Sequence, residues 1–253
     1  SAFGKYSTAF RSPTHSELNT AHGNRFYGYY YLSNPDLKPE TSENYEFGLK
    51  GDYSKLDFSL VGFISKYDDL IEDSVSSTGT DCIALIGRPC SVYKPSNVEE
   101  AEIWGIELNS EYNFKEDKTG FTLISSLAYS RGDDTSGTDD KELTSIEPFK
   151  AILGLRYTDV DNKWSTELTN TYVGDARTTA ALDDNPSKSY SVLDLTSVFN
   201  VNERLSVDVG IFNLNDTRYF NYSTVKSQKS STSDVNRFSE PGRNIKAGFK
   251  FIF

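Results

Sequence analysis

Two histidines and a run of tyrosines are the side chains of this sequence best suited to hold a ligand. The chain has only two histidines among 253 residues, His15 and His22, and Tyr27, Tyr29, Tyr30 and Tyr31 follow closely. Neutral imidazole is a common metal ligand, a phenolate can bind iron, and a tyrosine ring can stack on a planar molecule. The segment is therefore a candidate binding site, although most loop histidines are simply solvated and most tyrosine clusters are packing.

Carboxylates are numerous, but they do not form a recognisable catalytic site. Glu46, Asp57, Glu107, Glu111, Glu167, Asp194 and Asp208 each alternate with apolar residues, as expected for a solvated face. A surface protease that activates water with carboxylates and a histidine is an alternative. Neither histidine lies in an acid–base constellation, however, and no Ser-His-Asp arrangement, phosphate-binding glycine loop or nucleotide motif is visible. We therefore predict that the protein is not an enzyme.

Charge and hydropathy exclude other classes. The 26 basic and 37 acidic residues give a net charge of −11, and no basic stripe is present, so nucleic acid is not an expected partner. No run of about 18 apolar residues could form a transmembrane helix, which leaves a β-barrel as the only way to span a membrane. We expect residues 1–253 to be one structural unit. The absence of Met and the start at Ser1 suggest a piece of a longer protein.

The elements that would position these residues are strands. About ten segments show period-two alternation, each near the length that a tilted membrane strand needs. Examples are Tyr45 to Tyr53, Leu56 to Ile64, Trp104 to Phe114, Phe149 to Tyr157 and Ile245 to Phe253. The first segment, Ala2 to Phe10, is the least regular. Each of the others has one apolar and one polar face.

The connections alternate strictly between short and long. Short ones are expected at Asp52–Lys55, Lys115–Thr119, Asp159–Lys163 and Asn202–Arg204, and long ones at Arg11–Glu43, Tyr67–Glu100, Ser130–Glu147, Gly174–Ser189 and Leu214–Arg243. Long loops at one rim and aromatic residues at strand ends are typical of an outer-membrane barrel. A soluble sandwich also alternates, but it has no reason to gather its long loops at one end. The predicted fold is an all-β, antiparallel transmembrane β-barrel.

Several motifs resemble those of TonB-dependent outer-membrane receptors. The stretch Lys246 to Phe253 is similar to the C-terminal assembly signal of outer-membrane barrels, and Asn97 to Leu108 and Ile211 to Tyr219 resemble strand motifs of the receptors. Receptors of this family typically have 22 strands and an N-terminal plug. The resemblance thus implies that 1–253 supply about ten C-terminal strands of a 22-stranded barrel, with the plug domain absent from this chain.

The loop that carries His22 resembles the haem and haemoglobin uptake branch of this family. That branch has a phenylalanine-arginine-alanine-proline box and an asparagine-proline-asparagine-leucine box, with a histidine between them. Here Phe10-Arg11-Ser12-Pro13 and Asn34-Pro35-Asp36-Leu37 each depart by one residue, and neither change removes a ligand. His22 lies where the resemblance places the haem-ligating histidine, while His15 is too close to the first box.

The resemblance implies a bacterial outer-membrane transporter of haem, possibly taken from haemoglobin. His22 would be an axial ligand of the haem iron, Tyr27 and Tyr29 would contact the haem, and the second histidine of the family lies on the plug. The partners would be haem or a haemoprotein at the cell surface, outer-membrane lipid, and the TonB energy-coupling protein acting through the plug. Two alternatives stay open: a ferric-siderophore receptor of the same fold, in which His22 is incidental, and an adhesive or structural barrel.

Cys82 and Cys90 lie on the second long connection. Two cysteines at short spacing in a cell-surface loop predict a disulfide, because that compartment is oxidising. Two thiols alone are too few for a structural metal site. The apolar run Ile83 to Ile86 between them is suited either to a protein partner or to packing against other loops.

Overall fold

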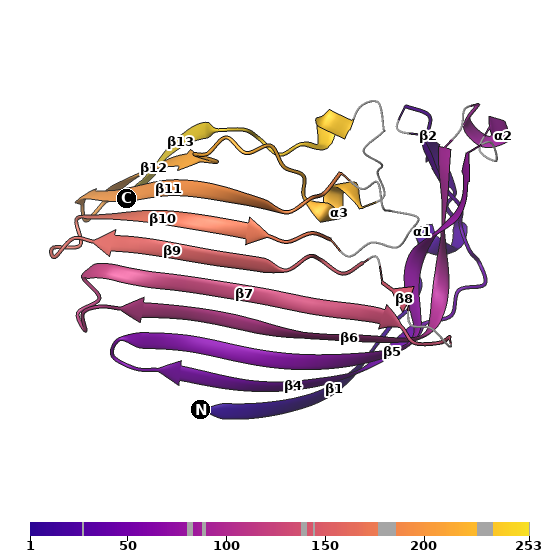
Figure 1. Ribbon diagram of the computed structural model, residues 1–253, viewed down its shortest axis with the longest axis horizontal. Helices are drawn as coiled ribbons and strands as arrows, with labels where there is room; N and C mark the ends of the chain where they lie inside the picture. Colours follow the sequence, from indigo (N-terminus) through magenta and orange to yellow (C-terminus); the bar gives the residue numbers. More distant parts are fainter. Residues whose placement is uncertain are drawn as a thin grey trace.

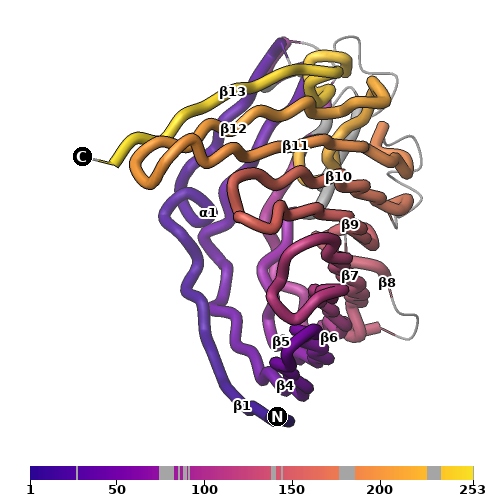
Figure 2. The backbone as a smooth tube through the Cα atoms, turned by 90° about the vertical axis from the view of Figure 1, so that its left-hand side faces the viewer, coloured from indigo at the N-terminus to yellow at the C-terminus, as the bar shows by residue number. Residues whose placement is uncertain are grey.

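A single curved antiparallel sheet makes up most of the chain in the computed structural model. The structure describes residues 1–26, 28–79, 83–87, 90–137, 141–143, 145–176, 186–226 and 235–252. Ten strands follow one another across the sheet in the order β1-β4-β5-β6-β7-β9-β10-β11-β12-β13, and Figure 2 shows them arranged around an arc. The sheet is not closed: β1 forms one edge and β13 the other.

The ten wall strands agree with the ten predicted segments. They are β1 (Ala2–Arg11), β4 (Glu40–Asp52), β5 (Leu56–Gly79), β6 (Cys90–Asn113), β7 (Gly120–Asp134), β9 (Lys150–Thr158), β10 (Trp164–Val173), β11 (Tyr190–Asn202), β12 (Leu205–Phe212) and β13 (Asn244–Phe251). Three short strands lie beside this path: β2 (His22–Asn24), β3 (Tyr29–Tyr31) and β8 (Lys141–Glu142). The short helices are α1 (His15–Asn19), α2 (Ile83–Ile86), α3 (Tyr222–Val225) and a 3₁₀ turn at Val235–Phe238.

The strand register separates an apolar face from a polar one. One line of paired residues crosses eight strands and is apolar throughout: Leu56, Tyr112, Leu123, Leu155, Leu168, Leu195, Ile211 and Ile245. A nearby line on the opposite face consists of Asn113, Thr122, Arg156, Glu167, Thr196, Gly210 and Lys246. Opposite residues of paired strands point to the same face, so this register puts the two sets on opposite sides of the wall.

The apolar face is exposed. Phe47 is 68% exposed, Leu153 56% and Phe249 79%, and aromatic rings adjoin each other near the short turns, as in the Phe121–Tyr157 and Tyr157–Trp164 pairs. A water-soluble sandwich would bury this face, whereas lipid would cover it in a membrane barrel. The prediction of a transmembrane barrel wall is confirmed, and the sandwich is excluded. In the described part of the chain, no helix has the length and apolarity needed to cross a membrane.

The two ends of the sheet differ as predicted, with one correction. Figure 1 shows the four short turns at one end and the long connections at the other. The stretch Tyr67–Glu100, however, is not a loop: β5 and β6 continue as a paired hairpin to Gly79 and Cys90. The residues buried in the described chain lie mostly at this end, including Tyr93 at 5%, Tyr222 at 3% and Val225 at 0% exposure.

Candidate functional site

The segment that carries His22 is built onto the distal part of the β5–β6 hairpin. His22 pairs with Tyr31 between the antiparallel strands β2 and β3, and Tyr31 pairs in turn with Tyr93 between the parallel strands β3 and β6. The backbone N–H of Leu32 continues this pairing by donating to the Tyr93 carbonyl at 2.8 Å. Figure 1 shows β2, α2 and this part of the hairpin standing together at the long-loop end. This register thus places His22 and Tyr31 beside Tyr93, which lies far from them in the sequence.

The aromatic rings of this line form a stack. The imidazole of His22 lies parallel to the Tyr31 ring, with 5.3 Å between centroids and 3° between planes. Tyr31 stacks on Tyr93 on its other side, at 5.2 Å and 24°. His22 itself is exposed, Tyr31 is half-buried and Tyr93 is buried. The stack therefore runs from a buried base to an imidazole that is open to solvent.

Tyr29 lies at right angles to this stack. Its ring centroid is 6.2 Å from that of His22, with 86° between the planes, and it makes a similar edge contact with Tyr31. A metal bound in line with an imidazole nitrogen lies in the ring plane, and a planar macrocycle around that metal stands roughly perpendicular to it. The orientation of Tyr29 is therefore compatible with stacking on such a macrocycle. The arrangement can offer one nitrogen ligand and one aromatic face.

The Tyr31 hydroxyl is held by Asp73 of β5, to which it donates at 2.9 Å. Burial and the negative charge of Asp73 both raise the pKa of Tyr31 above its usual value. Tyr31 is therefore a neutral phenol at physiological pH. Its ring is fixed on both faces and at its hydroxyl.

A small apolar cluster supports the other face of β3. Tyr30 and Leu32 pack with Ile86 against the buried residues Cys90 and Val92. A β-carbon at Gly23 of β2 would overlap the Tyr30 ring and would lie 2.8 Å from Ile86 Cγ2. Glycine at this position therefore lets β2 approach β3 closely enough for His22 to reach the stack.

The second sequence box anchors the loop to the β5–β6 hairpin. Leu37 is 8% exposed, and the Asn34 side chain donates to the Pro95 carbonyl at 2.9 Å. Asn97 of β6 accepts from the Lys38 N–H at 2.9 Å and donates to the Lys38 carbonyl at 3.0 Å and to the Asp69 carbonyl at 2.6 Å. Asp69 has a φ of 54°, which marks an irregular point in β5. Asn34 and Lys38 are thus tied to β6, and Asn97 also bonds across to β5.

The first box is also an anchor. Arg11 donates to both Glu40 carboxylate oxygens, at 2.8 and 3.2 Å, and to Glu17 of α1 at 3.1 and 3.3 Å. Glu40 also accepts from the Ile71 N–H at 2.8 Å. Partial burial would raise the pKa of Glu17, but hydrogen bonds from Thr14 and Arg11 outweigh it and lower that pKa. Arg11 therefore joins β1, α1, β4 and β5 at the base of the loop.

The remaining predicted residues have different outcomes. His15 lies on α1, where its Nδ1 is 3.4 Å from the Asn19 amide nitrogen, and no contact with the His22 stack is seen in the described residues. Tyr27 and Cys82 lie outside the described residues. Cys90 is buried at 7% exposure and is not a free thiol, but its predicted pairing with Cys82 stays a prediction.

The His22 stack is not part of a preformed metal-binding cluster in the described part of the chain. Within the described residues no three His, Cys, Asp or Glu side chains come together as a metal-binding group. Any metal bound at His22 would therefore have to bring most of its own ligands, as the iron of a porphyrin does. Sequence reasoning missed Tyr93, Asp73 and Asn97 as parts of the site. Apolar and polar residues alternate only irregularly through 90–100, so no clear sequence signal marked the extension of this strand.

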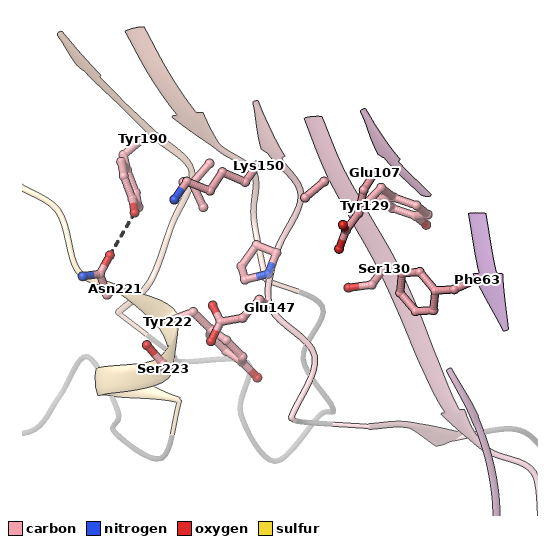
Figure 3. Close-up of a pocket in the computed structure, with 13 residues that line it drawn as sticks. Phe63, Glu107, Tyr129, Ser130, Glu147, Lys150, Tyr190, Asn221, Tyr222 and Ser223 are labelled. Carbon is pink, nitrogen blue, oxygen red and sulfur yellow. Dashed lines mark hydrogen bonds between the residues drawn. The ribbon is translucent and has the colours of Figure 1, made fainter. Parts of the chain in front are cut away.

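A cavity of about 390 Å³ lies on the polar face below α3. Its lining includes Glu107, Glu147, Lys150, Tyr190 and Tyr222, and Figure 3 shows Glu147 beside Tyr222 and the hydrogen bond from Tyr190 to Asn221. Burial and the nearby negative charge of Glu147 raise the pKa of Tyr222 to about 12. The cavity is lined by charges of both signs, so its lining does not indicate a single class of ligand. Sequence analysis did not predict it, because α3 is only one turn long.

Comparisons with known proteins agree with the barrel-wall architecture. A family model described as "TonB dependent receptor-like, beta-barrel" matches residues 1–214. The "Probable hemoglobin and hemoglobin-haptoglobin-binding protein 4" of Haemophilus influenzae is 26% identical over 98% of this chain and 27% of its own length. The "Hemoglobin-haptoglobin utilization protein B" of Neisseria meningitidis serogroup A is 27% identical over 95% of this chain and 34% of its own length. The chain thus spans about a third or less of these relatives.

Other similar proteins have different ligands in their names. The "Vitamin B12 transporter BtuB" of Photobacterium profundum is 30% identical over 88% of this chain and 33% of its own length. Among solved structures, "Copper transporter OprC" has a TM-score of 0.77 at 25% identity. The match covers all of this chain and 36% of the OprC chain. The siderophore receptor PirA from Pseudomonas aeruginosa has a TM-score of 0.65 at 20% identity over the whole chain and 39% of its own length, which supports the fold alone.

Proposed function

We propose that this chain, which belongs to the TonB-dependent receptor β-barrel family, takes up haem through its extracellular loops, with His22 as an axial ligand of the haem iron. Proteins of this family reside in the bacterial outer membrane and are transporters, not enzymes. Their barrels bind a ligand outside and are coupled to TonB. The proposal concerns the ligand of this member, its source and the residues that hold it.

The observation that carries the proposal is the exposed His22 imidazole on its aromatic stack. Both ring faces of Tyr31 are covered, by His22 and by Tyr93, while His22 is exposed and forms no hydrogen bond within the described part of the chain. Its nitrogens are thus available to an incoming metal. Tyr29 is perpendicular to the imidazole, as a ring stacked on a His-bound porphyrin would be. Neutral imidazole is a standard axial ligand of haem iron.

The haem source is proposed to be a haemoprotein at the cell surface. Relatives named for haemoglobin and haemoglobin–haptoglobin binding support this, since three of them align over 95–98% of the chain. Residues 1–253 would contribute ten wall strands of the barrel, with outer-membrane lipid against the apolar face and TonB as the energy-coupling partner. Haem would be the transported ligand, and no covalent chemistry is required.

A ferric-siderophore receptor is the second candidate. Siderophore receptors are among the structural neighbours, and in such a receptor aromatic and arginine side chains would contact the chelate while His22 would be incidental. An adhesive barrel with no small ligand is the remaining alternative. The three differ in one simple property: only the first requires iron–imidazole coordination.

The test is a haem titration of the intact receptor in detergent, followed by Soret absorbance. Wild type is compared with His22→Ala and with His15→Ala, a matched histidine on the same loop. The proposal predicts a Soret shift in wild type and in His15→Ala that is lost in His22→Ala. An unchanged shift in His22→Ala would refute that ligand, and no shift in wild type would favour a siderophore receptor or an adhesive barrel.

A further inference from the structure

We infer that Tyr31 is the positioning residue that fixes the imidazole plane of His22, and through it the orientation of bound haem. This inference rests on the proposed haem function. Tyr31 would not touch the iron and would not ionise. It would act through the stacked imidazole, while Asp73 and Tyr93 hold Tyr31 itself.

Tyr31 is restrained from three directions. Tyr93 covers one face of its ring, with 5.2 Å between centroids, and is only 5% exposed. His22 covers the other face. The hydroxyl donates to Asp73 Oδ2 at 2.9 Å, which fixes the rotation of the ring within the stack. Because Tyr93 and Asp73 belong to the paired strands β6 and β5, the position of Tyr31 is set by the hairpin.

The stack on Tyr31 takes the place of the hydrogen bond that usually orients a metal-bound histidine. Such a histidine normally donates its second ring N–H to a carboxylate or a carbonyl, which fixes the ring plane. In the described part of the chain His22 has no hydrogen-bond partner, and its near-parallel stack on Tyr31 is the contact that sets its plane. Without it the exposed imidazole would sample several rotamers, and ligation would then have to offset the entropy of ordering the ring.

The consequence for the ligand is geometric. An imidazole held within 3° of the Tyr31 plane directs a bound porphyrin to stand across that plane. Tyr29, at 86° to the imidazole, then has its ring in a suitable orientation to face the porphyrin. Loss of the Tyr31 ring should therefore weaken binding and also broaden the range of iron–imidazole geometries, whereas loss of its hydroxyl should do so to a lesser extent.

The test uses the intact receptor with Tyr31→Leu, Tyr31→Phe, Asp73→Ala and the double variant Tyr31→Phe/Asp73→Ala. Tyr30→Leu is the matched control, because it removes a ring from the same strand on the face packed against Cys90 and Val92. Haem affinity comes from Soret titration. Resonance Raman spectra of the ferrous complex are recorded with the plug histidine of the family replaced by Ala in every variant, so that the iron is five-coordinate. The width of the iron–histidine stretching band then reports the spread of coordination geometries, which a purely structural role of Tyr31 would leave unchanged.

We expect Tyr31→Leu to lower haem affinity by about threefold to tenfold, the usual worth of an aromatic pair, and to broaden the Raman band. Tyr31→Phe should restore most of the affinity. Tyr31→Phe and Asp73→Ala should each weaken binding by about twofold, and the double variant no further, because both remove the same hydrogen bond. These hydroxyl variants decide the matter if Tyr31→Leu does not assemble.

The outcomes separate the inference from the proposed function. Wild type that binds haem through His22, together with Tyr31 and Asp73 variants that match wild type in affinity and band width, would overturn the positioning role alone. The same loss in Tyr30→Leu as in Tyr31→Leu, with an unchanged Raman band in both, would also overturn it. Wild type without a Soret shift would overturn both proposals.

Discussion

Removing the Asn97 side chain should release the His22 loop from the hairpin without disturbing the barrel wall. Asn97→Ala deletes three hydrogen bonds, two to the Lys38 backbone at 2.9 and 3.0 Å and one to the Asp69 carbonyl at 2.6 Å. A typical intramolecular hydrogen bond contributes about 0.5–1.5 kcal/mol net. Only the two bonds to Lys38 hold the loop, because the Asp69 bond lies within the hairpin, and together they contribute about 2 kcal/mol. Local opening of the loop should then become roughly 30 times more frequent.

The assay is hydrogen–deuterium exchange of peptides covering residues 28–38 in the intact receptor. The amides of β3 and of the anchoring box should exchange roughly 30-fold faster in Asn97→Ala, and peptides from β9 to β12 should be unchanged. The control is Asn109→Ala, because Asn109 lies on the same strand but bonds to Ser126 of the wall at 2.8 Å. An exchange rate in Asn97→Ala within about threefold of that control would refute the idea that this amide holds the loop.

Three further outcomes follow from the same contacts. Gly23→Ala should separate β2 from β3, because its methyl group would overlap the Tyr30 ring, and haem affinity should fall in a Soret titration while receptor levels stay normal. Leu168 is 41% exposed on the apolar face, and Leu168→Lys should destabilise the barrel in lipid by up to about 2–4 kcal/mol, the cost of a lysine at the bilayer midplane. Thr169→Lys on the polar face should not have this effect. Urea unfolding of the receptor in vesicles measures both. The lowered pKa of Glu17 means that its ionised form stabilises the anchor fully above about pH 4.5. The protection factors of the α1 amides, which are corrected for the pH dependence of intrinsic exchange, should therefore fall as pH falls through that lowered pKa, and pH-independent protection factors would contradict the assignment.

The wall could be predicted from the sequence because lipid and water impose a strict rule on each strand. Residues such as Leu155 and Arg156 alternate between the two faces, and a slip of one residue would reverse them all. The short turns were predicted for a related reason, since polar residues such as Asn162, which adopts a φ of 54°, interrupt the alternation. Family motifs added the likeness to receptors, and the family model confirms it over residues 1–214.

The site was only partly predictable, because its geometry depends on pairing between distant segments. His22 and Tyr29 were identified from their types and from the flanking boxes. The interaction of Tyr31 with Tyr93 requires a parallel pairing of β3 with β6, and nothing local to either segment predicts it. The stretch Tyr67–Glu100 was interpreted as a loop because its alternation is less regular and contains Pro95, yet Pro95 pairs with Asp73 within the hairpin.

The extended hairpin changes the interpretation of the two boxes. On sequence alone they were signs of a haem-binding loop, with His22, Tyr27 and Tyr29 between them as the functional residues. In the structure, the Arg11–Glu40 pair joins four elements and Asn34 donates to the Pro95 carbonyl of β6, so the boxes fix both ends of the segment that presents His22. Ser12 and Asp36 depart from the family pattern, but Asp36 is exposed and takes part through its backbone N–H, which donates to Asn34 at 3.2 Å. A change at such a position leaves the anchor intact. A change at Arg11 or Asn34 would remove side-chain hydrogen bonds that hold the anchor together.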